Sequence, residues 1–224
     1  MYKETGFRGG QNKFENTQKE YSEFGLPIAR RKPISGSEGV IIECEKEGTH
    51  WKRMLEGEQK DFLEIAGPSL SFVDNEIINF NEYKDRTTCS NVSNDFTLKN
   101  QNGESVSAKE YVDVLADAAD LPFADKSFGA LFARNFRMED SKRLKPKPSP
   151  GSLQSDIENN AYIRKVIKEA YRVLDEKGMV VWLNLERADF QSLINAGFEP
   201  IFYQQRSYAN GRSRYQGVFQ KISQ

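Results

Sequence analysis

Short apolar runs, separated by polar and glycine-rich segments, recur along this chain from residue 39 onwards. Runs of this length that are rich in β-branched and aromatic residues are typical of buried strands. They predict strands at residues 39–44, 62–66, 76–83, 111–116, 128–133, 179–183, 198–203 and 215–222. The polar segments 84–110 and 137–155 are predicted to be loops, the first with a small hairpin.

Apolar residues at helical spacing lie between several of these runs. One such segment extends to Leu174, with Asp156 as its predicted N-cap, and a second covers residues 187–196. Residues 50–60 are predicted to form a short helix.

Strands that alternate with helices and end in an antiparallel pair predict an α/β fold. The expected architecture is a Rossmann-like open, mainly parallel sheet with a C-terminal antiparallel strand pair. Residues 1–60 lack this alternation and are predicted to form an N-terminal arm or cap on a domain of residues 61–224.

Charge and cysteine usage exclude several classes of function. The 32 basic and 33 acidic residues leave a net charge of −1, so no long-range field attracts nucleic acid or an anionic membrane. Cys44, Cys89 and the single histidine, His50, show no metal-ligand spacing, so we expect free thiols and no metal site. Residues 1–21 lack the apolar segment of a signal peptide, which predicts a soluble, cytoplasmic protein.

In an open parallel sheet, ligands bind outside the carboxyl ends of the strands, so the residues that follow each predicted strand are candidates for a site. Residues 117–128, DAADLPFADKSF, resemble the D-A-x-x-L-P-F-x-D-x-S-F-D stretch of class I S-adenosylmethionine-dependent methyltransferases of the type 11 kind. Residues 167–181, IKEAYRVLDEKGMVV, are similar to that family's E-x-x-R-V-L-K-P-G-G helix and the strand after it. The resemblance extends over residues 61–223 and implies S-adenosyl-L-methionine as cofactor.

The resemblance also implies cofactor-binding residues at matching positions. Asp117 and Ala118 would lie beside the adenine, and residues 62–69 correspond to the family's first motif. The second predicted strand ends where the family has its ribose-binding acid. The implied cofactor-binding residues are Glu64, Ala66, Gly67, Asn81, Glu82, Asp117 and Ala118.

Departures from the family pattern leave two functions open. The family's G-x-G-x-G loop appears with Ala66, Pro68 and Ser69, and Asn81 stands where an acid is usual. One function is methyl transfer to a small-molecule or unidentified acceptor, and the other is a catalytically inactive methyltransferase-like binding domain. A nicotinamide-dependent oxidoreductase fits poorly because the G-x-G-x-x-G fingerprint is absent.

Catalytic candidates follow the strand at residues 128–133. A general base is needed only if the acceptor must lose a proton, and Asn135, Glu139 and Asp140 are the candidates, with solvated loop residues as the competing interpretation. A basic segment follows, and we hypothesise that it attracts an anionic acceptor, an exposed loop being the alternative. Its cations are Lys142, Arg143, Lys145 and Lys147.

Overall fold

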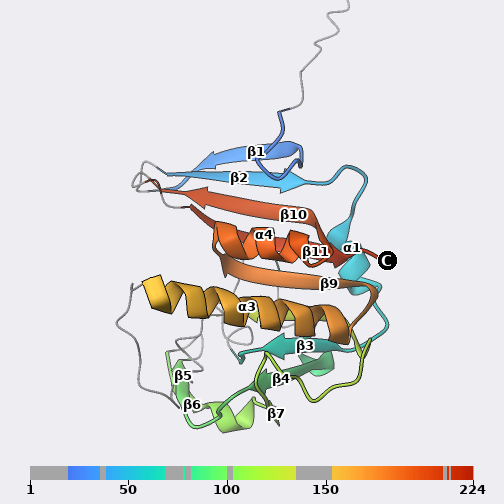
Figure 1. Cartoon of the computed structure of the whole chain (residues 1–224), viewed down its shortest axis with the longest axis vertical. Coiled ribbons are helices and arrows are strands. Elements are labelled where there is room, and N and C mark those ends of the chain that lie inside the picture. Colours follow the sequence, from blue (N-terminus) through green and yellow to red (C-terminus); the bar gives the residue numbers. More distant parts are fainter. Residues whose placement is uncertain are drawn as a thin grey trace, which may run out of the picture.

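A mixed nine-stranded sheet carries the described part of the fold (Figure 1). The computed structural model describes residues 20–35, 39–68, 78, 82–99, 103–134, 153–208, 211 and 213–223. In spatial order the strands are β1 (Ile28–Pro33), β2 (Val40–Glu45), β10 (Phe198–Ser207), β11 (Ser213–Lys221), β9 (Leu174–Leu185), β8 (Phe128–Arg134), β3 (Phe62–Ile65), β4 (Thr87–Asn91) and β7 (Val114–Leu115). The predicted small hairpin is confirmed and comprises β5 (Thr97–Lys99) and β6 (Ser105–Ser107).

Strand directions confirm the Rossmann-like, mainly parallel core. Strands β9, β8, β3, β4 and β7 are parallel neighbours, and β11 is antiparallel to both β9 and β10, as the predicted C-terminal pair requires. From β3 the chain proceeds outward to β4 and β7, then returns to β8 on the other side of β3. The strand order therefore reverses between β3 and β8, which is where open α/β sheets bind their ligands.

Strands β1 and β2 extend this sheet at its β10 edge. They pair with each other, and β2 pairs antiparallel with β10. Residues 28–45 thus share the sheet of the following segment, while the division into an arm of residues 1–60 and a domain of residues 61–224 stays a prediction.

Helices cover both faces of the sheet. α3 (Leu153–Val173) and α4 (Arg187–Asn195) lie together on one face, in front of the sheet in Figure 1, and α1 (Trp51–Glu56) packs on the other. The larger core cluster forms under α3 and α4 and includes Val166, Trp182 and Phe190; the smaller one forms under α1 and includes Trp51 and Phe132. No helix in the described residues is long and apolar enough to cross a membrane.

Several predicted elements are wrong or incomplete. The strand that follows β3 along the chain and pairs parallel with it is β4, at residues 87–91, in a segment predicted to be loop. Of the strand predicted at residues 76–83, the described residues Ile78 and Tyr83 lie outside any strand and are buried in the core cluster under α1. The strand predicted at residues 111–116 is only the short β7, and Asp156 lies inside α3 rather than capping it.

Strand β1 was not predicted because its sequence, IARRKP, is charged and ends in proline. Both features are typical of an edge strand.

Candidate functional site

The carboxyl ends of β3, β4, β7 and β8 meet at one edge of the sheet, beside the point where strand order reverses. The turn after β3 is tied to β4 by two hydrogen bonds. Gly67 N donates to the Ser90 carbonyl oxygen at 3.1 Å, and the Asn91 side-chain amide donates to the Gly67 carbonyl oxygen. This turn, which contains the predicted residues Ala66 and Gly67, is therefore held at the expected edge.

Glu64, another predicted cofactor residue, is buried below this turn. Its side chain is 2% exposed, and in the β3–β4 register it lies opposite Cys89. A Cβ added to Gly67 would lie 2.5 Å from both the Cys89 Sγ and the Glu64 Cδ, so only glycine fits here. Burial, with Glu64 nearby, raises the pKa of the Cys89 thiol, which therefore stays protonated.

Ala66 adopts a backbone conformation that normally favours glycine. Its φ is 56°, in the left-handed region that alanine occupies at a cost of roughly 1 kcal/mol. The turn thus has a residue in the left-handed conformation at position 66, although this residue is alanine and not glycine. The altered first motif is therefore compatible with a glycine-like backbone shape.

Asp117 and Ala118 follow β7 at the same edge. The exposed Asp117 carboxylate accepts hydrogen bonds through Oδ1 from the Ala119 backbone N–H at 2.9 Å and from the Tyr162 hydroxyl of α3 at 2.6 Å. These bonds fix the carboxylate, whose Oδ2 has no hydrogen-bond partner among the described residues. Ala118, the next residue, is buried, and its side chain is only a methyl group.

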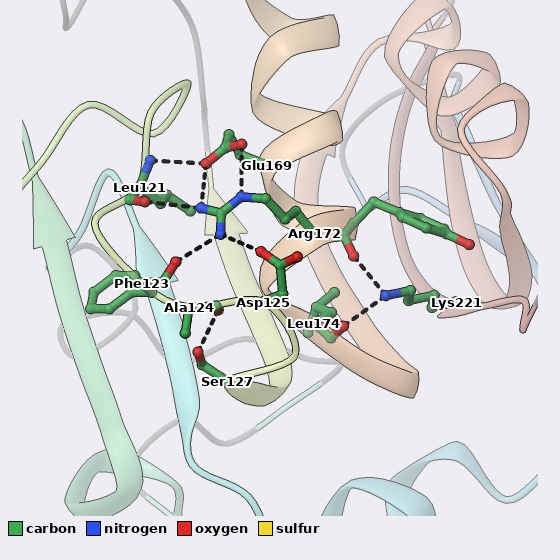
Figure 2. Close-up of polar contacts among 10 residues, drawn as sticks. Leu121, Phe123, Ala124, Asp125, Ser127, Glu169, Arg172, Leu174 and Lys221 are labelled. Carbon is green, nitrogen blue, oxygen red and sulfur yellow. Dashed lines mark hydrogen bonds and ion pairs between the residues drawn. The ribbon is translucent and has the colours of Figure 1, made fainter.

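The loop that follows Asp117 is fastened to α3 by one arginine (Figure 2). The Arg172 guanidinium donates to the carbonyl oxygens of Leu121 at 2.9 Å and Phe123 at 2.7 Å. It also pairs with Asp125 at 2.9 Å and Glu169 at 2.7 Å, and Glu169 in turn accepts from the Leu121 backbone N–H at 3.0 Å. Hydrogen bonding to Arg172 lowers the pKa of Glu169, although burial opposes the shift.

These bonds join the two segments that carry the family resemblance. Loop residues 121–125 belong to the first segment, and Glu169 and Arg172 to the second. Glu169 and Arg172 were not among the predicted site residues, although they position the loop. Their E-x-x-R spacing was the available signal, because residues three apart on a helix face the same side.

Among the described residues, one predicted cofactor residue, Glu82, is not brought to this edge. Glu82 precedes β4 and so lies toward the amino ends of the parallel strands, opposite the Gly67 turn. The residue that ends β4 is Asn91, so the expected acid position was placed on the wrong segment. Further predicted residues lie outside the described residues, namely Asn81, Asn135, Glu139, Asp140, Lys142, Arg143, Lys145 and Lys147.

The two cysteines are free, as predicted, and both are also buried. Among the described residues, no group of three or more His, Cys, Asp or Glu side chains is arranged to hold a metal ion.

No family model matches the chain, and no curated protein sequence does. Solved structures with a similar fold include a SAM-dependent methyltransferase from Methanosarcina mazei, with 11% identity, a TM-score of 0.44, and coverage of 77% of this chain and 98% of that one. The N-methyltransferase NodS from Bradyrhizobium japonicum has 11% identity and a TM-score of 0.46, with 77% and 94% covered. Geranyl diphosphate C-methyltransferase from Streptomyces coelicolor has 11% identity and a TM-score of 0.46, with 76% and 78% covered.

Proposed function

We propose that this chain is an S-adenosylmethionine-dependent methyltransferase that acts on a small molecule. The observation that carries the proposal is the convergence of the Asp117–Ala118 pair and the Gly67 turn at one sheet edge, beside the reversal of strand order. Both were expected at a cofactor site from the sequence alone, and an edge of this kind is the usual ligand position in the fold.

The described residues are best suited to bind the adenosine end of the cofactor. The exposed Asp117 carboxylate, fixed by Tyr162, has an oxygen available to accept a hydrogen bond from an amino or hydroxyl group. The turn at Ala66 and Gly67 follows β3 at the same edge of the sheet, and its left-handed backbone at Ala66 keeps the shape expected of the first motif.

When bound, the cofactor supplies an electrophilic methyl group on a sulfonium. The chain's task is to hold donor and acceptor in line at short distance, which needs positioning more than acid–base chemistry. An anionic acceptor, attracted by the basic segment at residues 142–147, stays part of the proposal. Two free, buried cysteines are typical of a reducing compartment and support a cytoplasmic location.

A second candidate function is a catalytically inactive methyltransferase-like binding domain. Asn91 favours it, because this residue ends β4 and its amide is already bonded to the Gly67 carbonyl oxygen. A carboxylate accepts hydrogen bonds from both ribose hydroxyls, whereas an amide offers one acceptor and one donor.

Calorimetric titration with S-adenosylmethionine and S-adenosylhomocysteine separates the two functions. We expect micromolar binding that Asp117→Ala weakens by about tenfold or more, because a hydrogen bond to a charged group is lost. Tyr162→Phe is the matched control. It removes the hydrogen bond between the Tyr162 hydroxyl and Asp117 but keeps the Asp117 carboxylate that would contact the cofactor. We expect it to change affinity by less than about threefold.

Absence of binding at millimolar cofactor would contradict methyl transfer and favour the inactive domain. Unchanged binding in Asp117→Ala would contradict the placement of the cofactor beside Asp117.

A further inference from the structure

A cavity of about 430 Å³ lies on the α1 face of the sheet, away from the candidate cofactor site. Strands β1, β2 and β10 form its floor, and α1 with the preceding His50 forms a wall. Strand β10 is four strand positions from β3, which is roughly 19 Å across the sheet at about 4.8 Å per strand. The cavity is therefore separate from the edge at Gly67.

The floor of this cavity is a row of polar side chains on neighbouring strands. The strand register places Arg30 of β1 opposite Glu43 of β2, and Glu43 opposite Gln204 of β10, which itself lies opposite Gln216 of β11. The Gln204 amide donates to Glu43 Oε1 at 3.0 Å and accepts from the Gln216 amide.

This polar row is unusual because one of its members, Gln204, is buried, with only 5% of its surface exposed. Burying an amide is unfavourable unless its hydrogen bonds are made, and apolar residues would form this floor at lower cost. The row therefore gives the cavity a floor of fixed donors and acceptors, which an apolar floor would lack.

Cations surround the floor. The cavity is lined by four, Arg30, Lys32, Lys52 and Arg53, against two carboxylates, Glu43 and Glu45. Lys32 is neutralised by Glu43 at 2.7 Å. Arg30 and Arg53 are exposed and form no ion pair within the described residues, so the cations of the lining exceed its carboxylates.

Aromatic stacking fixes the wall in place. The Trp51 ring stacks on Phe202 with centroids 5.3 Å apart and an interplanar angle of 30°, and Trp51 is buried. The backbone of α1, which carries Lys52 and Arg53, is thus anchored beside the polar floor.

We propose that this cavity binds a small phosphorylated polyol, of the sugar phosphate class. Arginine guanidinium groups at the rim bind the phosphate through charge-assisted hydrogen bonds. The Glu43 carboxylate and the Gln204 amide bind the hydroxyl groups, because a carboxylate accepts from hydroxyls but repels a bare anion. A ligand that carries both groups uses the rim and the floor together.

The test is calorimetric titration of the full chain with glucose 6-phosphate and ribose 5-phosphate, beside glucose and inorganic phosphate. We expect saturable binding of at least one sugar phosphate, with glucose and phosphate each weaker by about tenfold or more. Arg30→Gln should weaken sugar phosphate binding by about tenfold.

Arg31→Gln is the matched control. It makes the same charge change at the next residue of β1, whose guanidinium pairs with Glu20 and does not line the cavity. It should leave the affinity within about twofold.

Failure of both sugar phosphates to bind at millimolar concentration would overturn the proposal, as would inorganic phosphate binding equally well. Equal weakening by both variants would also overturn it, because the ligand would then respond to general surface charge. A single-stranded RNA oligonucleotide that outcompetes both sugar phosphates, with equal loss in both variants, would point to an extended basic surface instead. None of these titrations contains S-adenosylmethionine, so their outcome is independent of the proposed function.

Discussion

Replacing Arg172 with glutamine is expected to lower the free energy of unfolding by about 3 kcal/mol. The change removes the hydrogen bonds to the Leu121 and Phe123 carbonyl oxygens and both ion pairs, and leaves the half-buried Glu169 carboxylate without its cation. The Arg172 side chain is 31% exposed, so solvent weakens these contacts. The expected loss of stability is therefore smaller than the summed contributions of the same hydrogen bonds and ion pairs in a fully buried site. Urea denaturation at neutral pH measures it.

Two variants define the contribution of the guanidinium. Arg172→Lys keeps the charge but cannot serve two carbonyls and two carboxylates at once, so we expect an intermediate loss. Arg187→Gln breaks an ion pair to Glu23 at a side chain that is 72% exposed, and should cost less than about 1 kcal/mol. A loss in Arg172→Gln no larger than that in Arg187→Gln would contradict the proposed role of Arg172 in holding the loop.

Acid titration gives an independent check on the same contact. Because the Arg172 hydrogen bond lowers the folded-state pKa of Glu169, its stabilisation is present above the ordinary value of 4.5 and is lost as the pH falls through the lower folded-state pKa. In Arg172→Gln the free energy of unfolding should therefore fall less on acidification than in the unchanged protein. An equal fall in both proteins would contradict a stabilising contact between Glu169 and Arg172.

Phe190→Ala is expected to cost about 3–5 kcal/mol. The Phe190 side chain of α4 is fully buried and stacks on Phe24 with centroids 4.0 Å apart. It also packs against Tyr203 and Phe219, with centroids at 5.0 and 4.7 Å. The substitution leaves a cavity between α4 and the sheet and removes the ring on which Phe24 rests.

Thermal and urea unfolding measure this loss, and limited proteolysis measures the effect on residues 20–28. Phe190→Leu, which fills more of the space, should cost about half as much or less. A loss below about 1 kcal/mol in Phe190→Ala would show that the aromatic cluster does not hold α4 and the segment around Phe24 against the sheet.

The strands of the sheet centre and of the C-terminal pair could be predicted from the sequence. Strand β8, FGALFAR, is buried from Phe128 to Ala133, and β9 has a similar apolar run from residue 179 to residue 183. Such strands are covered by helices or core on both faces, so their whole sequence is apolar and the signal is strong.

Strand β4 shows why part of the fold could not be predicted. Its sequence, TTCSN, is polar, and Cys89 and Ser90 are buried because β3 and β7 flank them, not because they are strongly hydrophobic. The apolar segment at residues 76–83 gave a stronger local signal, although its described residues Ile78 and Tyr83 pack in the core outside any strand.

The wrong assignment of the second parallel strand also misplaced part of the predicted cofactor site. Asp117 and Ala118 were placed through the short motif they begin, and the start of that motif does follow the carboxyl end of β7. Glu82 depended on the strand at residues 76–83, so it was assigned to the wrong edge. The Arg172 contacts could not be predicted, because they join residues about 50 positions apart and depend on tertiary packing.

Amide hydrogen exchange with and without S-adenosylhomocysteine tests the central claim most directly. If the cofactor binds at the carboxyl ends of β3, β4 and β7, exchange should slow at residues 65–68, 90–92 and 115–121, while α4 and β10 stay unchanged. Unaltered exchange at saturating ligand, or protection confined to other parts of the sheet, would contradict a cofactor site at this edge.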